Sequence, residues 1–232
     1  MNDLLDLFII ALAGLVHATL QLGISALLLL YHASLGKNVK RKTRELVRDF
    51  NLGISLFIAL LLASTCFVTL VIFGGALPKS ALVILVGLIA AMAFGIWFLY
   101  YRKSTGTELW VPRSFARFIT ERADKTDDGV EAFSLGMLIA CAEVPFAMLL
   151  IITAANSVLN LPQPVQLLAI AVYVLIATMP MWLAQLLINN GKTIVDIQRW
   201  RVKNKQFLKV ISGVGFITLA IFLLAFKVMT DF

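Results

Sequence analysis

Six long apolar runs constrain what this chain of 232 residues can fold into. A membrane-spanning helix needs about 20 mostly apolar residues. Runs of that length lie roughly at 7–31, 51–73, 81–101, 133–155, 166–188 and 208–229. Of all residues, 60% are hydrophobic and 14% are charged, which is more apolar surface than a soluble chain of this size can bury. The sequence therefore predicts an all-α membrane protein with six transmembrane helices, because helices satisfy their own backbone groups in lipid.

Basic residues are concentrated in three of the five loops between these runs. Most of the 20 Lys and Arg side chains fall in loops 34–50, 102–132 and 189–207, whereas the two short loops hold only Lys79. Basic loops stay on the cytoplasmic side of a membrane. We therefore expect a multi-pass protein of the inner (plasma) membrane with both termini outside. The net charge of +7 then needs no nucleic-acid partner to explain it.

The long central loop divides the chain into two halves with three spans each. We expect a first three-helix repeat at 1–101, a cytoplasmic linker at 102–132 and a second three-helix repeat at 133–232. Because each half has an odd number of spans, the second half is inverted relative to the first. Inverted 3+3 repeats are common in secondary transporters, whose binding sites lie near the midplane. Within the linker, 107–122 has one apolar face beside arginines, which predicts a helix lying in the membrane interface.

Glu143 is the one charged residue predicted to lie deep within a span. Lys227 is near the end of the last run, where its side chain can reach the interface. Ionisable residues inside a membrane usually mark binding sites and proton pathways. Pro145 follows Glu143 two residues later and leaves the carbonyl near Cys141 without its helical donor. This pattern predicts a polar site in which Glu143 binds and releases a proton or cation. The alternative is a structural hydrogen bond between helices.

His17 lies near the centre of the first run. Gln21 and Ser25 follow at i+4 and i+8, so the three side chains form one polar stripe on a helix. His17 and Glu143 are expected at the same depth, which leads to the hypothesis that they face each other across the midplane. The alternative is that His17 hydrogen-bonds a backbone carbonyl.

The fifth run contains a second candidate kink at Pro180, with Tyr173 one to two turns before it. We place Tyr173 and Pro180 in the candidate binding site. The sequence has no Cys/His spacing typical of zinc and no recognisable cofactor motif, so we expect neither a metal nor a cofactor. Gly87 and Gly95 in the third run can support a helix contact, including one in a homodimer.

Cys66 and Cys141 both lie in apolar runs and allow a second interpretation. Two membrane-embedded cysteines can carry electrons by thiol–disulfide exchange. From the predicted span ends their depths differ by roughly 10 Å, whereas a disulfide needs Cα atoms within about 7 Å. The spacing therefore disfavours a static disulfide.

The layout resembles the lysine-exporter superfamily of six-span proteins. The resemblance rests on the 3+3 spans, the outward termini, the long central loop, the Cys141-Ala-Glu143-Val-Pro145 motif and the Tyr173…Pro180 pattern. This superfamily includes amino-acid exporters, metal-ion transporters and the electron carriers of cytochrome c biogenesis. The electron carriers have a partner cysteine in the first span, where this chain has Gly14-Leu-Val-His17-Ala. Nickel and cobalt transporters have an acid and a second histidine just after this point, where this chain has Thr19-Leu20-Gln21. The resemblance implies a transporter class.

Together these features predict a secondary transporter of the inner membrane, an exporter of a small solute or cation. Its expected partners are the lipid bilayer and a small-molecule or ion substrate. A membrane thiol–disulfide electron carrier and a non-transporting assembly or scaffold protein remain as alternatives.

Overall fold

The computed structural model describes all residues except 1, 21–26, 28–38, 101–112, 191–193 and 230–232. Within the described residues every regular element is a helix, and six of the helices are long and apolar enough to cross a membrane. These six are α1 (Asn2–Leu20), α3 (Val39–Phe73), α4 (Lys79–Gly95), α6 (Gly129–Leu159), α7 (Gln163–Asn189) and α9 (Lys205–Leu223). Two π-helical segments, η1 (Ile96–Tyr100) and η2 (Leu224–Val228), extend α4 and α9. The prediction of an all-α chain with six candidate spans is confirmed.

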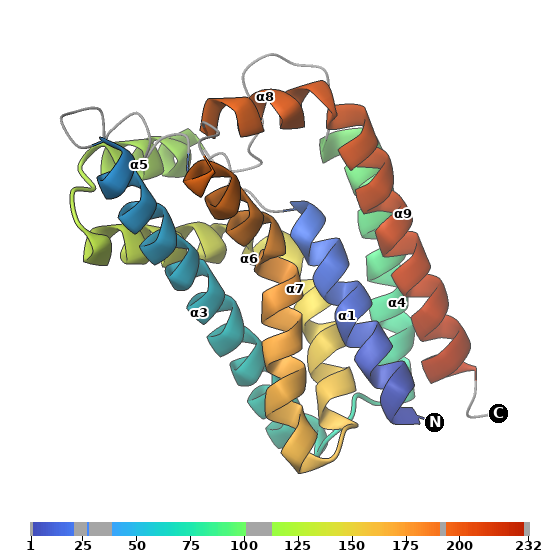
Figure 1. Cartoon of the computed structure of the whole chain (residues 1–232). Coiled ribbons are helices and arrows are strands. Elements are labelled where there is room, and N and C mark those ends of the chain that lie inside the picture. Colours follow the sequence, from blue (N-terminus) through green and yellow to red (C-terminus); the bar gives the residue numbers. More distant parts are fainter. Residues whose placement is uncertain (1, 21–26, 28–38, 101–112, 191–193, 230–232) are drawn as a thin grey trace.

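Two shorter helices lie at one end of the bundle, opposite the end where the chain begins and finishes (Figure 1). These are α5 (Arg113–Asp124) and α8 (Ile194–Lys203). We call this end the α5/α8 end and the other the termini end. Consecutive long helices run in alternate directions between the two ends (Figure 1). The described parts of the three basic loops therefore gather at the α5/α8 end, as their alternation along the sequence predicts.

Several predicted span boundaries are wrong by more than one turn. The first span begins at Asn2 instead of residue 7, so Asp3 and Asp6 lie inside a helix. The second helix begins at Val39, which makes most of the predicted loop 34–50 helical. This segment is rich in Lys, Arg and Glu, which are good helix formers whether or not lipid surrounds them. The helix predicted within 107–122 corresponds to α5, although residues 107–112 lie outside the described part of the chain, and its place in the membrane interface stays a prediction.

Helices α3 and α6 cross at a reciprocal contact of two glycines. A Cβ atom on Gly53 would collide with the backbone carbonyl of Phe133, and one on Gly136 would collide with the carbonyl of Phe50. Each glycine follows its phenylalanine by three residues in both helices, Phe50 to Gly53 and Phe133 to Gly136. The contact is thus locally two-fold symmetric, and small residues here allow the two backbones to touch.

Helix α9 packs between α4 and α1 through two further glycines. Gly213 lies under the indole of Trp97 in η1, where a Cβ atom would collide with the ring nitrogen. Gly215 faces Val16 of α1, and a Cβ atom there would come within 2.9 Å of the Val16 side chain. These contacts place α4 and α9 on one side of α1, with α3, α6 and α7 on the other (Figure 1).

The polar segment before α6 ties the α5/α8 end together. The carboxylate of Asp128 caps α6 by accepting a hydrogen bond from the backbone N–H of Glu131. Glu131 in turn accepts from the N–H of Asp127, and Lys42 of α3 contacts the carboxylate of Asp127 at 2.6 Å.

On α5, Ile119 and Ala123 are buried, and this helix contacts α6. The linker is therefore docked on the bundle through a short apolar face.

Gly87 and Gly95 do not support a contact within the chain. A Cβ atom on either would meet nothing within 4 Å among the described residues. Their use in a contact between two copies of the chain stays a prediction.

We expect Gly53→Ala and Gly136→Ala each to destabilise the protein, because the added methyl group collides with backbone atoms that have no room to move. Overpacking of this kind costs about 1–3 kcal/mol. Thermal unfolding in detergent measures the change. Gly87→Ala is the matched control, since it adds the same group in open space within a helix and should keep or raise the unfolding temperature, because Ala is the better helix former. Equal unfolding temperatures for all three variants would contradict the close crossing.

Candidate functional site

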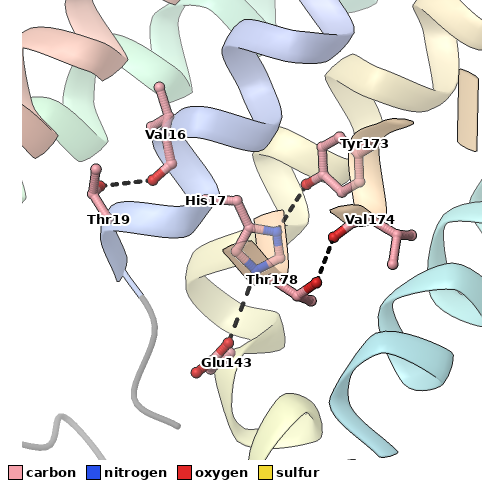
Figure 2. Close-up of polar contacts among 7 residues, drawn as sticks. All are labelled: Val16, His17, Thr19, Glu143, Tyr173, Val174 and Thr178. Atoms are coloured by element: carbon pink, nitrogen blue, oxygen red, sulfur yellow. Dashed lines mark hydrogen bonds and ion pairs between the residues drawn. The ribbon is translucent and has the colours of Figure 1, made fainter. Parts of the chain in front are cut away.

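Glu143 and His17 meet inside the bundle. The Nε2 atom of His17 lies 3.9 Å from Oε2 of Glu143, and the two side chains are 1% and 6% exposed. Figure 2 shows the imidazole of α1 pointing toward the carboxyl group of α6. The predicted proximity of these two residues is confirmed, while their role remains a proposal. At 3.9 Å the groups are within ion-pair distance but beyond the length of a direct hydrogen bond.

Tyr173 of α7 completes the group from the other side of the imidazole. Its hydroxyl lies 2.9 Å from Nδ1 of His17, and its side chain is fully buried (Figure 2). Which of the two atoms donates depends on the histidine tautomer. This hydrogen bond orients the ring so that Nε2 faces Glu143. Helix α1 and the two consecutive helices α6 and α7 thus each contribute one polar side chain.

The lipid-like surroundings decide which charge states this group can adopt. A net charge is costly in hydrocarbon, so neutral combinations are favoured. The His17–Glu143 pair is neutral either as imidazole with carboxylic acid or as imidazolium with carboxylate. Removal of one proton leaves a net negative charge, which a bound cation can neutralise. The geometry therefore allows exchange of a proton for another cation.

The two predicted prolines lie inside α6 and α7, where each acts on the helix backbone. Helix α6 changes direction between its first part, which crosses α3, and its second part, which runs to the termini end (Figure 1). Pro145 lies in this helix and its ring is exposed, whereas Glu143, two residues earlier, is buried. Pro180 similarly lies inside α7 and is half-buried. Both prolines remove a helical donor, as the sequence predicts.

Gln21 and Ser25, the rest of the predicted polar stripe, lie outside the described residues. The stripe is therefore tested only at His17.

The two cysteines are placed far apart. Cys66 is buried, and its Sγ lies 3.9 Å from the carbonyl oxygen of Ala155. Ala155 is 14 residues beyond Cys141 on α6, a distance of about 21 Å along a straight helix. Cys141 itself is exposed on the bundle surface, and both thiols are free. This placement agrees with the expectation that no static disulfide joins them.

Sequence reasoning missed a second buried charge pair, at the termini end. The Lys227 ammonium lies 2.8 and 2.9 Å from the two carboxylate oxygens of Asp6. Asp6 is 1% exposed and Lys227 is 15% exposed. The ammonium of Lys227, which the sequence places near the end of a span, is thus neutralised by a buried acid. The sequence signal for this pair was the presence of opposite charges near the outer ends of the first and last apolar runs. It was missed because the first span was predicted to start at residue 7, which left Asp6 outside the span.

Comparison of the chain with known protein families, with curated proteins and with solved structures found no match. Within the described residues, the fold and the site define a class: six helices long and apolar enough to span a membrane, with a buried ionisable group between α1, α6 and α7.

We expect Lys227→Met to destabilise the protein strongly, because it leaves the Asp6 carboxylate buried without its cation. Removing one partner of a buried ion pair costs about 3–5 kcal/mol. Combining it with Asp6→Leu should restore most of the loss, since the charge is then gone. Lys42→Met is the matched control, because its pair with Asp127 is exposed and is expected to contribute about 0–1 kcal/mol. Unfolding by heat or denaturant in detergent compares the four proteins. An unchanged stability for Lys227→Met would contradict the assigned contact.

Proposed function

We propose that this protein is a secondary transporter of the inner membrane that exports a small solute or cation in exchange for protons. The buried contact between His17 and Glu143, oriented by Tyr173, is the observation that supports this function. Ionisable residues within membrane spans commonly mark binding sites and proton pathways. In the proposed cycle Glu143 binds a proton in one state and the transported cation, or a cationic group of the solute, in the other.

The proposal includes two inverted halves that move against each other about this site. The third helices of the two halves support it. Helices α4 and α9 run in opposite directions side by side, each ends in a π-helical segment, and each contacts the π-helical segment of the other. This is the relation expected for two elements exchanged by a two-fold axis in the membrane plane. Movement of this kind exposes a midplane site to one side at a time.

The side of the membrane follows from the basic loops. Because Lys and Arg gather at the α5/α8 end, we assign that end to the cytoplasm and the termini end to the outside. The overall layout also resembles the lysine-exporter superfamily, which agrees with export as the direction.

The test is flux in proteoliposomes that carry a pH gradient. We screen alkali cations, divalent cations and amino acids separately, and record the internal pH. Glu143→Gln should abolish proton movement coupled to any solute that the unmodified protein transports, because the amide does not titrate and has no negative charge to neutralise a cation. His17→Gln should weaken coupling, since it removes the second titratable group.

The control is the double variant Cys66→Ala, Cys141→Ser, which should transport normally. A thiol–disulfide carrier would instead lose its activity in this variant while Glu143→Gln kept it. A protein that moves no solute and no protons under any gradient is a scaffold, and this result would refute the transporter assignment.

A further inference from the structure

A second set of polar groups, two of them buried and two half-buried, lies between α3 and α7, away from the His17–Glu143 contact. We call this set the α3–α7 seam and define it as Asn51, Ser55, Thr178 and Gln185. Asn51 is fully buried, and its amide Nδ2 donates to the carbonyl of Met181 and to Oε1 of Gln185, both at 3.1 Å. One turn further along α3, the hydroxyl of Ser55 donates to the carbonyl of Asn51 at 2.8 Å and lies 3.5 Å from the hydroxyl of Thr178.

Asn51 has one acceptor that the described residues leave unused. Its Oδ1 atom is buried and accepts no hydrogen bond from them. The amide orientation is set by the Met181 carbonyl, which can only accept, so that Nδ2 and not Oδ1 must face it. A buried polar atom without a partner costs free energy, so the site calls for a small ligand that donates a hydrogen bond. Water is the ligand whose size and donors suit such a position.

The seam begins near the ionisable group and leads to the α5/α8 end. Thr178 follows Tyr173 by five residues on α7, which is about 7.5 Å along the axis. Figure 2 shows Thr178 on α7 in the same view as His17 and Glu143. Gln185 lies two turns beyond Thr178, and the next turn brings the carbonyl of Asn189, which accepts a hydrogen bond from the exposed Arg44 at 2.9 Å. Polar groups thus recur at intervals of one to two turns from Thr178 to the solvent.

In the opposite direction the site is enclosed by apolar residues. Below His17 on α1 lie Ile10 and Ala13, and below Glu143 on α6 lie Ala147 and Leu150, all of them at most 3% exposed. Asp6 is on the same face of α1 as His17, three turns away, and its pair with Lys227 lies beyond this apolar layer. Thr153 is the first buried polar side chain past the layer on α6. Its hydroxyl donates to the carbonyl of Leu149 in its own helix.

We propose that the α3–α7 seam binds water and carries protons between Glu143 and the solvent at the α5/α8 end. This inference rests on the proposed function, in which Glu143 is the proton-binding group. When the acid is deprotonated, its O–H bond breaks and a seam water takes the proton. That water passes a proton of its own along the seam until a buffer molecule accepts it. The titratable groups packed around Glu143 are His17 from α1 and Tyr173 from α7, and α3 presents no charged residue between Asn51 and Phe73.

The test uses infrared spectroscopy of the full chain in lipid nanodiscs, which leave both ends open to buffer. The C=O stretching band of protonated Glu143 is identified by its absence in Glu143→Gln. After a switch from H₂O to D₂O, the shift of this band reports how fast the carboxyl proton exchanges by the quickest route. Thr178→Val should slow the exchange by about tenfold, equivalent to about 1.4 kcal/mol in the barrier. Asn51→Leu, at the other end of the seam, should slow it in the same direction.

Thr153→Val is the matched control. Thr153 and Thr178 are both buried, and each donates to the carbonyl four residues earlier at 2.8 Å, so valine removes the same bond in both. The control should exchange at the rate of the unmodified protein. Equal rates in Thr178→Val and Thr153→Val, with the band present, overturn the seam as the route and leave Glu143 as a proton site. Absence of any band that depends on Glu143 at every pH overturns both the seam and the proposed function.

Discussion

The site of this protein depends on the cost of an ionisable group in hydrocarbon. A carboxyl group in the middle of a membrane helix has no water to solvate it, so its neighbours must supply polar partners. His17 and Tyr173 from two other helices meet this requirement around Glu143. Asp6 and Lys227 meet it for each other at the termini end. Both groups join α1 to later parts of the chain, so polar contacts in the bundle also specify which helices are neighbours.

Close helix packing makes these contacts possible. Lipid gives little hydrophobic drive for helices to associate, so close approach relies on small residues. The glycines of α3 and α6 bring the backbones of these helices together, and those of α9 allow it to fit between α4 and α1. Proline contributes in a different way, since α6 is bent near Glu143 and presents its first part to α3 and its second part to the termini end. The bend and the close crossing together place the carboxyl group at the level of His17.

The polar groups are distributed unequally about the centre of the bundle. Side chains that hydrogen-bond between helices continue from the centre toward the α5/α8 end, as far as Gln185. Toward the termini end, apolar side chains such as Ile10 and Leu150 follow directly. An alternating-access transporter is expected to show such inequality in any single conformation, because its site communicates with one side at a time. Within the proposed transport cycle, this conformation is the state open to protons from the α5/α8 end.

The sequence by itself determined the class of fold and the most unusual residue. Length and apolarity of the runs suffice to predict spans, because the thickness of a bilayer sets the length of a helix that crosses it. Glu143 was identifiable because a charge within such a run is rare. Its proximity to His17 could be predicted because the position of a residue along its span gives its depth in the membrane. The two residues have equal predicted depths, and depth can be read from the sequence.

Only the tertiary structure decided which side chains complete these groups. The role of Tyr173 in orienting His17, the pairing of Asp6 with Lys227 and the hydrogen bonds of Asn51 depend on the rotation of each helix about its axis and on which helices are adjacent. An apolar run fixes neither property, because lipid-facing and helix-facing positions in a membrane are both apolar. Rotation and adjacency follow from the glycine contacts and the bend of α6, which become apparent only when the helices are packed together.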